Sequence, residues 1–221
     1  MRSVLFLAYP FLVYLAFTRL ETRSVGAALL ALYLASFTLR LRGSAAGLWA
    51  VVRQHLGILA LCGVAIWSGE RLWLLLLPCL VSLYLLWTFA SSLRRGPPMI
   101  ERFARLVEDD LPDFTLPYCR KVTWLWCAFL AANAVFVGAL AWRAPLEWWA
   151  LYSGFVFYLL MGALLAGEFV VRKLWFRYYQ GGAADRILAR IFPPEATANG
   201  RRSLAYAAER MRRAREAAPT T

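Results

Sequence analysis

Motifs that mark enzyme active sites are scarce in this sequence. Its 221 residues contain no Walker loop and no GxGxxG, GxSxG, HxxxxD or HExxH motif, so the signatures of nucleotide binding, serine hydrolysis, acyl transfer and zinc proteolysis are missing. An acidic DDxxD stretch occurs once, at residues 109–113, and is not repeated. There is one histidine, His55, and the four cysteines form neither a CxxC motif nor a cluster with it. We therefore expect no disulfide framework, no metal and no cofactor.

Acidic residues are also scarce, with 13 Asp and Glu against 25 Lys and Arg, so the net charge is +12. In a soluble chain such a charge would suggest nucleic acid. However, 61% of the residues are hydrophobic and only 17% are charged, against about 45–50% and about 25% in soluble domains. We therefore interpret the basic residues as markers of the cytoplasmic face of a membrane protein. The expected partner is a phospholipid membrane, with no nucleic acid.

Long apolar runs predict an all-α, polytopic membrane protein, because about 20 helical residues cross about 30 Å of hydrocarbon. We expect about six transmembrane helices, at residues 3–20, 24–41, 46–68, 71–91, 122–142 and 147–171. They form a transmembrane domain over 1–171, and residues 172–221 form a basic cytoplasmic tail. The third span is the weakest, because Arg53, Gln54 and His55 interrupt its apolar run.

The basic residues predict the orientation of these spans. With the N-terminus inside, the outer loops hold only four of the 25 Lys and Arg residues, namely Arg19, Arg23, Arg71 and Arg143. Basic residues concentrate on the cytoplasmic side of membrane proteins. Both termini are therefore expected to be cytoplasmic, whereas five spans would place one basic cluster outside.

The last two spans are predicted to pair as an antiparallel hairpin, because only a short turn at Ala144-Pro145 separates them. This register brings Lys121 close to Glu168 at the cytoplasmic ends. Small side chains four residues apart allow helix backbones to approach closely. Such residues are expected to line the contact, namely Ala134 and Gly138 on one span and Gly162 and Ala166 on the other.

Residues 97–121 interrupt the apolar pattern between the fourth and fifth spans. Apolar residues recur there at spacings of three and four, at Ile100, Phe103, Val107 and Leu111. This spacing predicts a short amphipathic helix over 99–111 that lies on the cytoplasmic interface. The basic residues of the segment are a candidate site for an anionic ligand or partner: Arg102, Arg105, Arg120 and Lys121. The alternative is a solvated surface helix, held by Glu101–Arg105 and Arg105–Asp109 pairs.

Two ionisable residues in the apolar runs, Glu168 and His55, are candidate catalytic bases. Both lie a few turns from the predicted inner boundary, and ionisable groups inside a membrane are costly and often functional. The alternative for Glu168 is a salt bridge to Lys121, Arg120 or Arg172. His55 has no second histidine or cysteine cluster with which to build a metal site.

Two other residues are expected to shape the spans. Asn133 lies in mid-span, where an interhelical hydrogen bond to Tyr158 or Ser153 is the expected use. Proline lacks the N–H group that a continuous helix needs, so Pro78 is expected to kink the fourth span.

The stretch RRGPPMIERFARLVEDDLPDFTLPYCRKVTWLWCAFL and the later GEFVVRKLWF resemble a family of small bacterial inner-membrane proteins encoded in aryl-polyene, or xanthomonadin-type, pigment clusters. The family pattern is an R-x-G-x-x-P-x-I-x-R-x-A stretch, a Leu-Pro pair, a Y-[TC]-R-x-V-T segment and a G-E-[YF] near the end of the last span. It falls here on Arg94, Gly96, Ile100, Arg102, Ala104, Leu111, Pro112, Tyr118, Arg120, Val122, Thr123, Gly167 and Glu168. The stretch from Gly96 to Ile100 is one residue shorter than in the pattern, so the proline is shifted to Pro97 and Pro98, and Cys119 stands where threonine is usual.

The resemblance implies a setting in which aromatic acyl chains grow on a carrier protein, are transferred to a lipid and move to the outer membrane. We expect an inner-membrane component that binds an anionic lipid or acyl intermediate, or docks pathway enzymes or the acyl carrier protein. Its site would comprise Arg102, Arg105, Arg120, Lys121 and Glu168. The alternatives are an integral-membrane acyl or lipid transferase, with His55 or Glu168 as base, and a small lipid transporter subunit. Whether the protein is an enzyme stays open.

Overall fold

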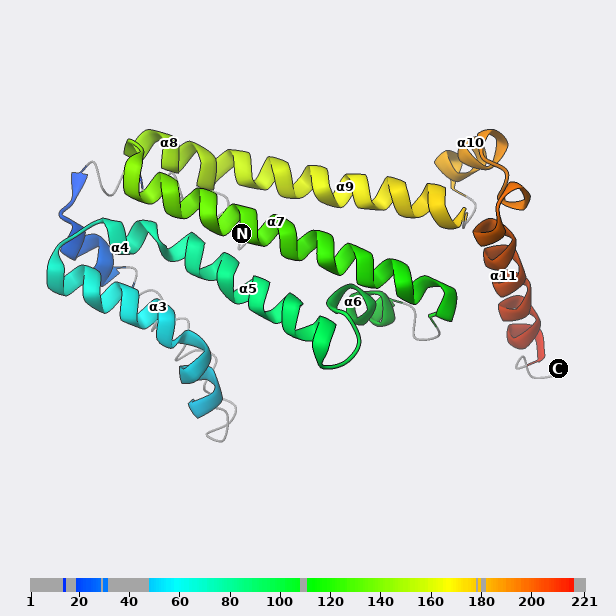
Figure 1. Cartoon of the computed structure of the whole chain (residues 1–221), viewed down its shortest axis with the longest axis horizontal. Coiled ribbons are helices and arrows are strands. Elements are labelled where there is room, and N and C mark those ends of the chain that lie inside the picture. The colour runs from blue at the N-terminus through cyan, green and yellow to red at the C-terminus, as the bar shows by residue number, and fades with distance from the viewer. Residues whose placement is uncertain are drawn as a thin grey trace. The chain divides into compact units, whose positions relative to one another are not determined.

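The structure is a computed structural model of the chain (Figure 1). It describes residues 14, 19–28, 30–31, 48–107, 111–177, 179 and 182–216. Within this part, every regular element is a helix, as the sequence predicts. The predicted spans 3–20 and 24–41 lie largely outside the described residues, as does the acidic stretch 108–110.

The described helices follow one another through short connections (Figure 1). The first are α3 (Leu48–Ser68), α4 (Leu72–Leu75), α5 (Leu77–Arg94) and α6 (Met99–Val107). The later ones are α7 (Leu116–Arg143), α8 (Leu146–Leu151), α9 (Phe157–Phe176), α10 (Ala183–Ile191) and α11 (Ala198–Glu216). Shorter turns are the 3-10 segments η2 (Asp113–Thr115) and η4 (Pro194–Ala196) and the π-helical segment η3 (Tyr152–Val156).

Among the residues that the structure describes, three helical segments have the length and apolar composition to cross a membrane. They are Leu72–Arg94, Asp113–Arg143 and Leu146–Phe176, and they correspond to the last three predicted spans. The third predicted span coincides with α3, but its apolar described part, Leu59–Ser68, is shorter than a crossing needs. The described chain therefore supports a membrane protein with three of the six predicted spans.

The chain divides into two compact units. Unit 1 comprises Met1–Ser91 and Leu125–Leu160, and unit 2 comprises Ser92–Trp124 and Met161–Thr221. Each unit contains parts of α7 and α9, so the two units are described separately below.

In unit 1, the core centres on Trp149, which is fully buried. Its indole Nε1 donates a hydrogen bond of 3.1 Å to the backbone carbonyl of Leu75, the last residue of α4. The helix is interrupted at Leu76, two residues before Pro78. Proline has no N–H to continue the helical pattern, which accounts for an interruption at this point; the kink expected at Pro78 stays a prediction.

Unit 1 also contains the predicted antiparallel hairpin. The hydroxyl of Tyr152 donates to Asn133 Oδ1 over 2.8 Å, and the rings of Phe157 and Phe129 stack with centroids 6.0 Å apart. Residue numbers rise on one side of these contacts and fall on the other, so the paired segments are antiparallel.

The predicted use of small residues in this hairpin is wrong. The carbonyl of Ala134 accepts a hydrogen bond from Cys79 Sγ of α5 over 3.3 Å, and a Cβ added to Gly138 would meet the same sulfur at 3.7 Å. A Cβ added to Gly162 would meet no described atom within 4 Å. The small face of α7 therefore packs on α5, because aromatic rings fill the space towards α9.

In unit 2, a turn and two hydrogen bonds fix the start of α6. Gly96 has φ +132°, a conformation that favours glycine. The backbone N–H of Met99 donates to Ser92 Oγ over 2.9 Å, and that of Ile100 donates to Thr123 Oγ1 of α7 over 3.4 Å. Both donors belong to the first turn of the helix, where N–H groups have no intrahelical partner.

The Glu101–Arg105 pair expected for a solvated α6 is confirmed, but the exposure of Glu101 that this alternative implied is wrong. Glu101 is only 7% exposed, whereas Leu106 is 82% exposed. The bond from Ile100 to Thr123 turns this side of α6 towards α7, and Arg105 supplies the counter-charge for Glu101. The structure describes α6 as far as Val107, and residues 108–110 of the predicted helix lie outside the described part.

Candidate functional site

Glu168 of α9, predicted as a site residue, is held by two side chains of unit 2. The hydroxyl of Tyr118 donates to Glu168 Oε1 over 3.3 Å, and Arg172 Nε lies 3.5 Å from the same oxygen. Among the described residues, neither Arg120 nor Lys121 forms an ion pair with it, so Arg172 is the partner among the three proposed. Tyr118 precedes Lys121 by about one helical turn. The predicted register was therefore close, but it assigned the contact to the wrong side chain.

Two of the predicted anion-binding residues, Arg105 and Arg102, already have protein partners. Arg105 Nη2 lies 2.9 Å from Glu101 Oε1, and its Nε donates to the same oxygen over 3.0 Å. Arg102 Nε donates to the backbone carbonyl of Pro97 over 2.9 Å. Arg105 therefore neutralises a buried carboxylate, whereas the exposed Arg102 binds a neutral group and keeps its charge uncompensated.

Around the end of α5 and in the first turns of α7, unit 2 also carries four exposed cations that form no ion pair with any described residue. We call them the unpaired cations, and they are Arg94, Arg95, Arg120 and Lys121. The carboxylates Glu101, Glu168 and Asp185 are occupied by other basic side chains. Charge on the unpaired cations is therefore available to an external anion, and guanidinium groups bind phosphate or carboxylate through paired donors.

The interior of unit 2 near the start of α7 is aromatic. Phe176 packs edge-on against Tyr118, with ring centroids 5.1 Å apart. Cys119, which follows Tyr118 in the chain, is buried. Among the described residues, no group of three His, Cys, Asp or Glu side chains is arranged to hold a metal ion. The geometry suits packing and charge compensation better than a nucleophile activated by a base.

Asn133 lies at the centre of a polar network in unit 1. Its Nδ2 donates to Ser82 Oγ over 2.8 Å, and its Oδ1 accepts from Tyr152 over 2.8 Å. The predicted interhelical hydrogen bond exists, but its partners are neither Tyr158 nor Ser153. Ser153 Oγ is buried without a hydrogen-bond partner in the described chain. The π-helical segment that begins at Tyr152 changes the spacing of side chains, which an α-helical projection does not anticipate.

The basic tail folds back on the end of α9 in unit 2. Lys173 Nζ lies 2.7 Å from Asp185 Oδ1 of α10. Arg177, with φ +48°, donates through Nη1 to the carbonyl of Pro193 over 2.7 Å. These contacts fix both ends of α10, so this part of the predicted tail is ordered and packed.

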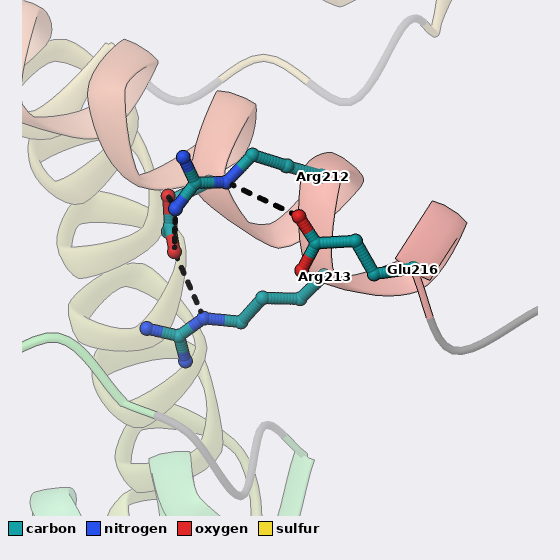
Figure 2. Close-up of polar contacts among 4 residues, drawn as sticks. Arg212, Arg213 and Glu216 are labelled. Carbon is teal, nitrogen blue, oxygen red and sulfur yellow. Dashed lines mark hydrogen bonds and ion pairs between the residues drawn. The ribbon is translucent and has the colours of Figure 1, made fainter.

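The last helix, α11, carries its own ion pairs (Figure 2). Arg212 Nη2 lies 2.8 Å from Glu209 Oε2, and Arg213 Nε lies 3.1 Å from Glu209 Oε1. Arg212 Nε also lies 3.8 Å from Glu216 Oε1. Hydrogen bonds from Arg213 and Arg212 hold the pKa of Glu209 below its usual range. The acidic residues of α11 are therefore satisfied within the helix.

The chain matches no protein-family model, and no curated protein or solved structure shows significant similarity to it.

Proposed function

We propose that the protein is a bacterial inner-membrane component of aryl-polyene lipid biosynthesis. In this proposal it has cytoplasmic termini and binds the anionic headgroup of an acyl-lipid intermediate at the inner face. The observation that carries the binding role is the set of unpaired cations on unit 2: Arg94, Arg95, Arg120 and Lys121. The pigment setting rests on the resemblance described above, and the orientation rests on the distribution of basic residues.

Exposed apolar side chains in unit 2 favour a lipid over a purely polar anion. On α6, Leu106 is 82% exposed and Phe103 is 50% exposed, and the two residues lie about one turn apart on the same side of the helix. Arg102, which is also exposed, lies next to them on that surface. An amphiphile with an anionic head and an apolar chain complements this combination. An acidic carrier protein would bind the cations through its own charge, and that interaction would not bury the exposed apolar side chains of α6.

A transferase is the second candidate, and it needs an available base. Glu168 is held by Tyr118 and Arg172, an arrangement that favours a structural role. His55 lies in α3, and its side chain is outside the described part of the chain. The substitutions Glu168→Gln and His55→Gln separate the two functions, because each preserves size but removes a base.

The proposal is tested in pigment-producing cells that lack the chromosomal copy and carry plasmid-borne variants at matched protein levels. Lipid-linked aryl polyene should fall several-fold with Arg120→Gln/Lys121→Gln. It should stay unchanged with Arg202→Gln/Arg215→Gln on α11, which removes the same charge from exposed positions. Normal pigment lipid in the first variant would refute the proposed site. Loss of product in Glu168→Gln or His55→Gln alone, with normal protein level, would instead support a transferase.

A further inference from the structure

Helix α10 exposes an apolar pair beside a basic pair. Ile187 and Ile191 are 63% and 62% exposed, and because they lie one turn apart they share one side of the helix. Arg186 and Arg190 are also exposed and lie roughly 100° around the helix axis from the isoleucines. The outer surface of α10 therefore combines two large apolar side chains with two positive charges.

The opposite side of α10 is fixed to the rest of unit 2. Asp185, the only acidic residue of α10, is 8% exposed and pairs with Lys173 over 2.7 Å. Phe192, which follows α10, accepts through its backbone carbonyl a 3.0 Å hydrogen bond from the hydroxyl of Tyr179. These contacts keep the isoleucines facing outwards and leave no negative charge on the exposed side of α10.

The ion pair also holds the first turn of α10 beside the end of the candidate span. Lys173 lies in the last turn of Leu146–Phe176, the segment with the length and composition to cross a membrane. Asp185 is therefore held at the level at which this span ends. Trp175, in the same turn, is 52% exposed, and tryptophan is enriched at the boundary between membrane and water.

We infer that α10 is an interfacial helix that docks on an anionic lipid surface next to α9. Ile187 and Ile191 insert at the boundary of the acyl chains, and Arg186 and Arg190 bind lipid phosphates. Anionic lipid is the occupant because the exposed side of α10 is both apolar and exclusively basic, which is the pattern of helices that lie in charged membrane interfaces. This surface is not part of the proposed pigment-lipid site, and the inference does not depend on that function.

The test is hydrogen–deuterium exchange of the full chain, with one copy in each lipid nanodisc. Amides of Ala183–Ile191 should exchange more slowly in discs rich in phosphatidylglycerol than in discs of phosphatidylcholine alone. Each arginine near an anionic surface contributes about fivefold to binding. The variant Arg186→Gln/Arg190→Gln should therefore lose most of the difference between the lipids.

Two further variants make the result specific. Arg202→Gln/Arg215→Gln on α11, which removes the same charge, should leave the lipid dependence of α10 intact. Ile187→Ser/Ile191→Ser should weaken protection of α10 in both lipids, whereas exchange in α9 stays unchanged if the fold is intact. Equal exchange of wild-type α10 in the two lipids would overturn the inference. So would an equal effect of the α11 variant, or protection that arises only in discs holding two copies.

Discussion

The ammonium group of Lys173 lies 2.7 Å from Asp185 Oδ1, and the two side chains are only 20% and 11% exposed. This single pair joins the end of the last candidate span to the first turn of α10. A charged hydrogen bond contributes about 1.5–3 kcal/mol, and removing one partner leaves the other buried and uncompensated.

The substitution Asp185→Asn should therefore release α10 locally. We expect the free energy of opening of α10 to fall by about 1.5–3 kcal/mol, which accelerates its amide exchange by roughly ten- to a hundredfold. The matched control is Asp113→Asn, because Asp113 is exposed and forms no ion pair with a described residue. If Asp185→Asn leaves exchange in α10 at the wild-type rate, the pair does not hold the helix.

The polar network of unit 1 predicts a contrast between two neighbouring residues. Tyr152→Phe removes the hydrogen bond to Asn133, so it should destabilise the protein by about 0.6–1 kcal/mol. Ser153→Ala removes a buried hydroxyl that has no partner in the described chain, so it should be neutral or slightly stabilising. Thermal unfolding in detergent micelles distinguishes the two variants. The network has no stabilising role if Tyr152→Phe is as stable as Ser153→Ala.

Gly200 is expected to tolerate no side chain. A Cβ added there would collide with the backbone carbonyl oxygen of Pro194, and a rigid backbone cannot move aside as a side chain can. Alanine normally stabilises a helix by about 1 kcal/mol relative to glycine. Gly200→Ala should reverse that sign and cost roughly 1–3 kcal/mol, observed as faster exchange in α11 and η4. Gly167→Ala is the control, since no described atom lies within 4 Å of its added Cβ. Faster exchange in both variants would refute the steric explanation.

The ion pairs of α11 predict a dependence on acid. The pKa of Glu209 is held below its ordinary value of 4.5 by hydrogen bonds from Arg213 and Arg212. A depressed pKa in the folded state means that the stabilisation is complete above pH 4.5 and is lost as the pH falls through the lowered value. Exchange in α11, corrected for the intrinsic effect of pH, should therefore accelerate on acidification. Glu209→Gln should remove most of this pH dependence. If exchange in α11 of that variant still accelerates in acid as in the wild type, protonation of Glu209 is not the cause.

Local patterns predicted the parts of the fold that depend on local chemistry. Apolar length alone located the segments Leu72–Arg94, Asp113–Arg143 and Leu146–Phe176, because crossing hydrocarbon imposes a length that is readable in the chain. The short turn at Ala144-Pro145 likewise predicted the antiparallel hairpin. Both are consequences of neighbouring residues, and neither requires knowledge of distant contacts.

The site depended on contacts that the sequence does not display. The burial of Glu101 follows from the bond between Ile100 and Thr123, which are 23 residues apart. Helical periodicity instead placed Glu101 on a solvated face. The hairpin register predicted that Lys121 lies close to Glu168. The observed partner, Tyr118, lies about one helical turn before Lys121 on the same helix.

The binding of acyl lipid to the unpaired cations is tested most directly by native mass spectrometry. The full chain is purified in mild detergent from pigment-producing cells, as wild type and as Arg120→Gln/Lys121→Gln. The wild type should carry the mass of an aryl-polyene lipid, and the variant should lose most of that adduct. A wild-type protein without acyl lipid, or a variant with equal occupancy, would contradict the proposed function.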